Sequence, residues 1–88
     1  MNAPIAMDTV ADVVTVDVIP GASITRTVEV LPSLLANYDA RGGLVSVEVL
    51  SRAAFSRQEV VDHLEELLPD ALLYQLHHSL SSNGWRNP

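Results

Sequence analysis

The sequence predicts an α+β domain in which an antiparallel β-meander of about four strands packs against one or two C-terminal amphipathic helices. Up to about residue 53, apolar and polar residues alternate in short runs that Pro and Gly separate, which is typical of strands joined by turns. After residue 54, Leu and Val recur every three or four positions, the spacing of one face of a helix. A run of strands followed by helices indicates the α+β class.

The 88 residues are sufficient for a single domain and leave no room for a second core. We expect a loose leader at residues 1–7, the meander at 8–53, a helical part at 54–84 and a tail at 85–88. With 48% hydrophobic residues the chain is apolar for its size, and so small a domain buries only about 60–65% of the surface of its unfolded chain. We therefore expect a second copy or another protein to cover part of the apolar surface.

Four runs of alternating residues predict the strands: residues 10–19, 24–31, 34–39 and 44–50. Pro20 and Gly21 end the first run and Pro32 the second, because Pro cannot donate to a strand ladder and Gly favours turns. Residues 40–43 form a hairpin loop. Pairing across this loop places Tyr38 opposite Val45, Ala36 opposite Val47 and Leu34 opposite Val49.

These three pairs predict one apolar face for the sheet. The other face mixes polar residues with Leu35, Leu44 and Leu50, and it is too apolar for a fully solvated surface. We expect this second face to be partly covered by a helix or by a second subunit.

The C-terminal part carries the clearest helix signals. Ser56 and Glu59 have the spacing of a capping box, which predicts the start of a helix, and Pro69 predicts its end. Asp70 is placed to begin a second helix. The apolar stripe of the first helix comprises Val60, Val61, Leu64, Leu67 and Leu68, and that of the second comprises Leu72, Leu73, Leu76 and Leu80.

The charge balance limits the classes of partner. Eleven carboxylates outnumber five arginines, and the net charge of −6 repels nucleic-acid phosphates and anionic membranes. A charge-selected partner is therefore expected to be a basic protein; alternatively, the acidity only keeps an apolar domain soluble. The candidate docking residues lie on the outer face of the first helix: Glu59, Asp62, Glu65 and Glu66.

The cellular setting is constrained by three absences in the sequence. There is no Cys, which excludes disulfides and thiolate metal sites. No apolar run approaches the ~20 residues of a membrane span, and the first residues do not have the pattern of a signal peptide. We expect a cytoplasmic protein.

Catalytic and metal-binding patterns are weak. Glu59, His63 and Glu66 lie on one edge of the first helix and could hold a divalent ion, but a solvated helix edge is the ordinary interpretation. The adjacent His77 and His78 point about 100° apart on a helix, so they cannot serve one ion from the same face. We assign no catalytic, metal or cofactor-binding residue and expect no cofactor.

The strand carboxylates leave one possibility open. Asp17, Glu29 and Glu48 are predicted on one face of the sheet, with Asp39 at the hairpin loop. Paired carboxylates perform acid–base catalysis where burial and proximity drive their two pKa values apart. No nucleophile accompanies them, and a turn Asp that binds its own backbone explains Asp39 more simply.

Three segments resemble a known family: residues 11–16 (ADVVTV), 27–30 (TVEV), and the hairpin of 34–39 (LLANYD) and 42–50 (GGLVSVEVL). Over about residues 7–53 the chain resembles the YuzE-like domain of unknown function, a family of small prokaryotic proteins. Asn37 stands where that family usually has an acid, and Ser46 where it commonly has Gly. The resemblance implies a β-meander packed on a helix and no established activity. Some members are similar to small proteins encoded beside putative toxins, which by analogy makes an antitoxin-like role conceivable.

Three hypotheses on function follow. The first is a non-enzymatic interaction module that self-associates through Leu35, Leu44, Leu50, Leu72, Leu73, Leu76 and Leu80. The second is an acidic, antitoxin-like neutraliser of a basic protein. The third and most remote is a metal-dependent or acid–base enzyme.

Overall fold

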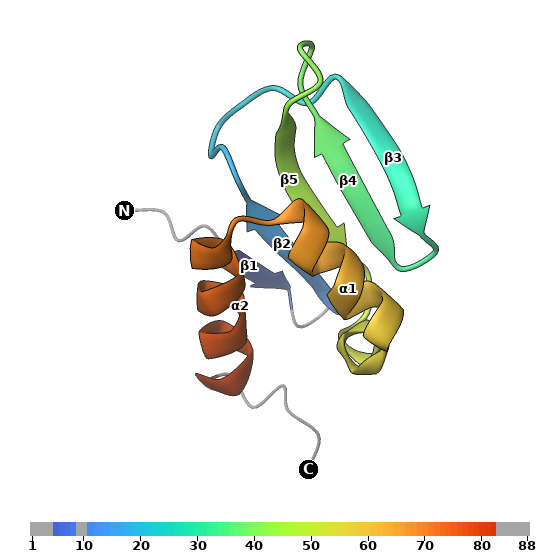
Figure 1. Cartoon of the computed structure of the whole chain (residues 1–88), viewed down its shortest axis with the longest axis vertical. Coiled ribbons are helices and arrows are strands. Elements are labelled where there is room, and N and C mark those ends of the chain that lie inside the picture. Colours follow the sequence, from blue (N-terminus) through green and yellow to red (C-terminus); the bar gives the residue numbers. More distant parts are fainter. Residues whose placement is uncertain (1–4, 9–10, 83–88) are drawn as a thin grey trace.

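The computed structural model of the protein describes residues 5–8 and 11–82, and the side chains of these residues up to Leu80 (Figure 1). The strands are β1 (Ile5–Asp8), β2 (Val13–Asp17), β3 (Arg26–Leu31), β4 (Leu34–Tyr38) and β5 (Leu44–Val49). A 3₁₀ helix, η1 (Arg52–Ser56), leads into α1 (Gln58–Leu67) and α2 (Asp70–Ser82). The predicted α+β class is confirmed, with five described strands where the sequence predicted about four.

All neighbouring strands are antiparallel, in the order β1-β2-β5-β4-β3. β2 pairs with β5 and not with β3, so the connection between β2 and β3 crosses past the β4–β5 hairpin to the opposite edge of the sheet (Figure 1). The central position of β5 places Val47 opposite both Val16 and Ala36, which concentrates the apolar residues of three strands.

The predicted loose leader at residues 1–7 is wrong for its second half. Ile5–Asp8 forms β1, in which Ile5 lies opposite Val16 and Met7 opposite Val14. Both side chains pack against the core, since they alternate with Ala6 and Asp8 in the period of a strand. Residues 1–4 lie outside the described part of the chain.

The core lies between one face of the sheet and the two helices (Figure 1). The sheet contributes Val14, Val16, Leu34, Ala36, Val47 and Val49, and the helical part contributes Ala54, Val60, Leu64, Leu68 and Leu76. The predicted pairs of Ala36 with Val47 and of Leu34 with Val49 are confirmed.

The third predicted pair of the hairpin is wrong. Tyr38 lies opposite Leu44 and not Val45, because a bulge shifts the register after Asn37. Leu44 consequently packs against the core, although strict alternation predicted it on the other face.

The predicted capping box is also wrong. α1 begins at Gln58 after Arg57, whose side chain makes no capping hydrogen bond. The hydroxyl of Ser56 donates instead to the carbonyl oxygen of Ala53 at 2.7 Å, because Ser56 is the last residue of η1. The predicted break at Pro69 and start at Asp70 are confirmed. The end of the predicted helical part and the tail at 85–88 lie beyond the described residues.

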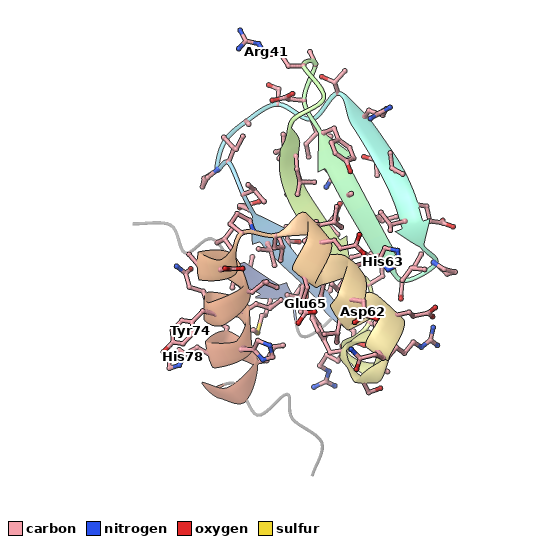
Figure 2. The ribbon with its side chains drawn as sticks, viewed as in Figure 1. Arg41, Asp62, His63, Glu65, Tyr74 and His78 are labelled. Atoms are coloured by element: carbon pink, nitrogen blue, oxygen red, sulfur yellow. The ribbon has the colours of Figure 1, made fainter. Side chains whose placement is uncertain are left out.

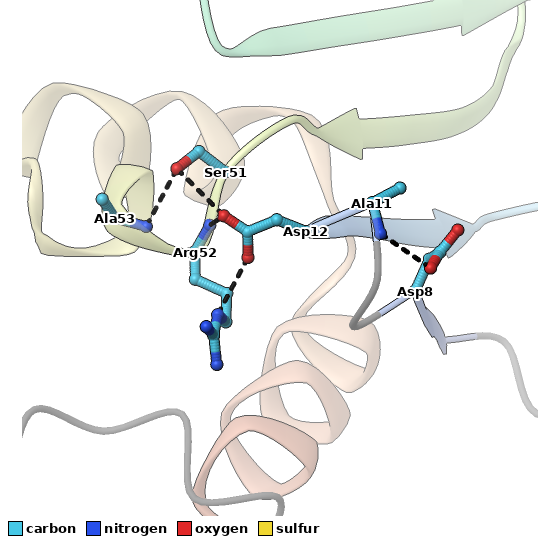
Figure 3. Close-up of polar contacts among 6 residues, drawn as sticks. All are labelled: Asp8, Ala11, Asp12, Ser51, Arg52 and Ala53. Carbon is cyan, nitrogen blue, oxygen red and sulfur yellow. Dashed lines mark hydrogen bonds and ion pairs between the residues drawn. The ribbon is translucent and has the colours of Figure 1, made fainter.

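A polar clasp fixes where the helical part leaves the sheet (Figure 3). Asp12 adopts the left-handed φ of 59°, which Asp tolerates better than most residues. Its Oδ1 accepts from Arg52 Nε at 2.8 Å, and its Oδ2 accepts from Arg52 N at 3.2 Å. Ser51 Oγ lies 3.4 Å from the same Oδ2 and accepts from Ala53 N. The β1–β2 turn is thereby tied to the start of η1.

Candidate functional site

The face of the sheet opposite the helices carries two rows of mainly polar side chains, which we call the polar face. By strand register the first row is Thr27, Asn37, Ser46 and Asp17. The second row is Glu29, Leu35, Glu48 and Thr15. The face therefore brings together polar residues that are up to 33 positions apart in the chain, Thr15 and Glu48 being the most distant directly opposed pair.

Asn37 is the centre of this face. Its side chain is only 2% exposed, and its amide nitrogen donates to Ser46 Oγ and to Glu48 Oε2, both at 2.9 Å. Its Oδ1 accepts from Thr27 Oγ1 at 2.7 Å. Every polar atom of the buried amide thus has a partner, and the network joins β3, β4 and β5. It orders three strands and leaves the amide of Asn37 no free donor for a ligand.

The strand carboxylates Asp17, Glu29 and Glu48 share the polar face by register, as predicted. Asp39 lies in the hairpin turn, where its Oδ1 accepts from the backbone N–H groups of Arg41 and Gly43 at 2.9 Å each. The interpretation of Asp39 as a turn residue is confirmed. Glu29 is exposed on β3, whereas Glu48 is tied to Asn37.

The possible metal edge of α1 gains no support from the geometry. His63 Nδ1 lies 2.7 Å from the carbonyl oxygen of Glu59, one turn earlier on the same helix. Among the residues that the structure describes, no group of three His, Asp or Glu side chains could hold a metal ion. His77 and His78 are exposed on α2.

The acidic residues of α1 form a second surface, the acidic face, made of Glu59, Asp62, Glu65 and Glu66. All four are exposed, and Figure 2 shows Asp62 and Glu65 on the helix together with His63. Asp62 accepts from Gln58 Nε2 at 2.8 Å, one turn away on the same helix. The sequence prediction that these carboxylates lie on the outer side of the helix is confirmed.

The leucines predicted for self-association are mostly used inside one copy. Leu76 is 3% exposed and belongs to the core, so its predicted role at an interface is wrong. Four others pack against the core: Leu44, Leu72, Leu73 and Leu80. The reason is that α2 folds back on the sheet and contacts β1 (Figure 1). Leu35 is half-buried on the polar face, and Leu50 is 38% exposed after β5.

The most accessible part of the sheet is the β3 edge, defined as residues Arg26–Glu29, which the alternation of residues did not single out. All four residues are exposed, and β3 lies beyond the area that the helices cover (Figure 1). Val28 is 37% exposed although it lies opposite the fully buried Ala36. The Arg26 guanidinium lies over the Tyr38 ring, 5.2 Å from its centroid. Arg26 alternates with the apolar residues Ile24 and Val28. A charged residue in such a row indicates that the row is not fully buried, and this was the available signal in the sequence.

Comparisons with protein-family models, curated proteins and solved structures found no match for this chain. Within the described residues, neither helix has the length and the apolar character needed to cross a membrane. The surfaces of the molecule therefore carry the available information on its function.

Proposed function

We propose that this protein is a non-enzymatic protein-interaction module that associates with itself. The observation that supports this proposal is the β3 edge, an exposed strand at one end of the sheet. An edge strand presents unpaired backbone N–H and C=O groups, which a further strand can satisfy. The opposite edge is less exposed, since α2 packs against β1 and two of its four residues, Ile5 and Met7, are half-buried.

The apolar surface near the β3 edge strengthens the proposal. Ile24 is 52% exposed and Val28 is 37% exposed, and both lie at or just before β3. Covering apolar area on association is favourable at roughly 25 cal/mol per Å² before the entropic cost of binding is subtracted. The leucines of α2 do not take part, because they face the core of their own copy.

Self-association is expected to appear as a concentration-dependent mass. Sedimentation equilibrium of the full chain should show a species of twice the 9.5 kDa of one chain at high concentration. A contact through one short strand is small, so the dimer should dissociate on dilution. A monomer at every concentration up to about 1 mM, where the binding free energy is only about −4 kcal/mol, contradicts the proposal.

A second candidate is an acidic neutraliser of a basic protein. The acidic face supports it, because Glu59, Asp62, Glu65 and Glu66 are all exposed on α1 and the net charge is −6. This candidate draws on the resemblance to the YuzE-like family, through which an antitoxin-like role in a prokaryotic cytoplasm is proposed by analogy.

Binding by the acidic face is expected to be strongly salt-dependent. A complex with a basic protein captured at low ionic strength should weaken sharply as salt approaches about 0.15 M, where the Debye length falls to about 8 Å. Replacing Glu65 and Glu66 by Gln should weaken it further, whereas the conservative Glu-to-Asp pair should retain it. A complex that is insensitive to salt and to both pairs rules out this candidate.

A further inference from the structure

The backbone of β3 has a definite polarity that follows from its neighbour. Leu50 N donates to Ser33 O at 2.9 Å, so Ser33 turns its backbone groups towards the β5 side. In an antiparallel ladder these directions alternate, and Leu34, Ala36 and Tyr38 therefore turn theirs towards β3. The hydrogen bond from Thr25 N to Tyr38 O at 2.8 Å agrees with this assignment.

The same alternation assigns the groups of β3. Arg26 lies opposite Tyr38 and Val28 opposite Ala36, so these two residues direct their N–H and C=O groups to β4. Thr27 and Glu29 then direct theirs outward, away from the sheet. The β3 edge therefore offers two N–H donors and two C=O acceptors to a further strand.

We propose that the partner at this edge is the β3 strand of a second copy, paired antiparallel about a two-fold axis that passes beside Val28. Two five-stranded sheets then form one continuous sheet, with the helices of both copies on the same face. This inference rests on the proposed self-association and specifies its surface and its register. An isologous contact of this kind presents the same residues from both sides.

The register follows from two conditions. A two-fold axis normal to the sheet keeps each face on its own side, so directly opposed residues must come from the same face. The outward groups of Thr27 and Glu29 must also meet outward groups of the partner strand. Registers centred on Thr27, Val28 or Glu29 all satisfy the first condition. The register centred on Val28 alone sets the outward groups of both Thr27 and Glu29 against outward groups of the partner, because Thr25 N–H is directed to Tyr38 and a bulge follows Glu29.

Side-chain chemistry favours the same register. Centring on Glu29 places two carboxylates directly opposite each other, which is unfavourable, and it runs into the bulge between Glu29 and Leu31. Centring on Thr27 places Arg26 opposite the exposed Val28. Centring on Val28 pairs the two valines and sets Thr27 opposite Glu29 twice, so that four backbone hydrogen bonds form. Val28 then occupies a non-hydrogen-bonded pair, in which side chains approach most closely.

Pairing through the β3 edge closes at two copies. Each copy has one β3 edge, and the two-fold contact consumes both edges. The bulge after Glu29 keeps the regular part of the strand short, which restrains further pairing. A weak, closed dimer is the expected product.

A charge at the centre of the contact is the first test. Val28→Lys places two ammonium groups opposite each other across the axis, while one copy tolerates the change because Val28 is 37% exposed. Sedimentation should show the wild type as a dimer at high concentration and the variant as a monomer, with the dissociation constant of the dimer raised at least tenfold. Equal urea midpoints at low concentration confirm that the variant is folded. Tyr74→Lys, at a side chain 75% exposed on α2, should leave the dimer intact.

Cysteine cross-linking tests the register, because the chain has no Cys of its own. Non-hydrogen-bonded pairs bring Cα atoms to about 4.5 Å, within the range that a disulfide spans. Val28→Cys should therefore cross-link efficiently under mild oxidation. Thr27→Cys and Glu29→Cys, which report the two rejected registers, should remain mostly uncross-linked.

The outcomes distinguish a failure of the proposed β3 pairing from a failure of the proposed self-association. If the wild type and the Val28→Lys variant both dimerise and no β3 cysteine cross-links, self-association is retained and the β3 edge is rejected as its surface. Cross-linking through Thr27→Cys instead of Val28→Cys rejects the register. A wild type that stays monomeric rejects both the inference and the proposed function.

Discussion

Leu76→Glu is expected to unfold the protein. The side chain is 3% exposed in the core between α2 and the sheet. Removing a buried leucine costs about 2–5 kcal/mol, and a buried carboxylate without a partner adds a penalty of several kcal/mol. The sum approaches or exceeds the whole stability of a small domain, which is about 5–15 kcal/mol at most. Far-UV circular dichroism and urea titration should show little or no cooperative transition.

Two variants of the same helix serve as controls. Tyr74→Glu introduces the same carboxylate at a side chain that is 75% exposed, and its effect on the free energy of unfolding should stay within about 0.5 kcal/mol. Leu76→Ala should remain folded with a loss of about 2–5 kcal/mol. A Leu76→Glu chain that is folded and monomeric would contradict the placement of Leu76 and return it to an interface between copies.

The contrast between Leu76 and the β3 edge shows what local sequence pattern can predict. The apolar stripe of α2 was visible in the spacing of its leucines, but the spacing did not say whether the stripe faces its own sheet or a second copy. That choice depends on the angle between α1 and α2 at Pro69, and on the presence of β1 as a surface for α2. Neither is encoded in the period of one helix.

Strand neighbours are similarly non-local. The short loop of residues 40–43 makes the pairing of β4 with β5 nearly inevitable, and two of its three predicted pairs are correct. The bulge after Asn37 breaks the third, because alternation alone does not signal an inserted residue. β3 lies at the edge because β2 pairs with β5 and not with β3. The connection from β2 to β3 must therefore pass the β4–β5 hairpin, and no local pattern indicates this.

For the polar face, the residues were predictable from alternation, but their hydrogen bonds, which join three strands, were not. Alternation across the hairpin placed Asn37, Ser46 and Glu48 on one side of the sheet, but it described that side as a mixed surface to be covered. It did not predict that the Asn37 amide would be buried and fully hydrogen-bonded. The distances that decide this, between 2.7 and 2.9 Å, depend on side-chain rotamers on three strands.

Asn37→Asp is the second change with a large expected effect. The new carboxylate replaces the amide donor that lies 2.9 Å from Glu48 Oε2, so two negative charges meet on the polar face. At an effective dielectric constant of about 20, charges some 4 Å apart repel by about 4 kcal/mol, part of which Glu48 can relieve because it is half-buried. We expect a loss of about 2–4 kcal/mol at pH 7. Asn37→Ala should cost less, about 1–3 kcal/mol for the lost hydrogen bonds.

The pH dependence distinguishes charge repulsion from a simple loss of hydrogen bonds. Protonating one carboxyl of the pair removes the repulsion in the folded state, so the folded variant binds more protons than its unfolded chain. Its stability relative to the wild type must then fall as pH rises and recover as pH is lowered towards about 4. Asn37→Ala introduces no charge, and its deficit should change little over the same range. Urea titrations at several pH values measure both.

A double-mutant cycle assigns the effect to Glu48. In the Asn37→Asp background, Glu48→Gln restores a donor and removes the second charge, so it should recover most of the lost free energy of unfolding. The same Glu48→Gln change in the wild type should be mildly destabilising, because the Asn37 amide then meets another neutral amide in place of a carboxylate. Opposite signs in the two backgrounds give a coupling energy of about 1–3 kcal/mol. Equal effects in both backgrounds would mean that Asn37 and Glu48 do not interact, and that the buried amide is held by Ser46 and Thr27 alone.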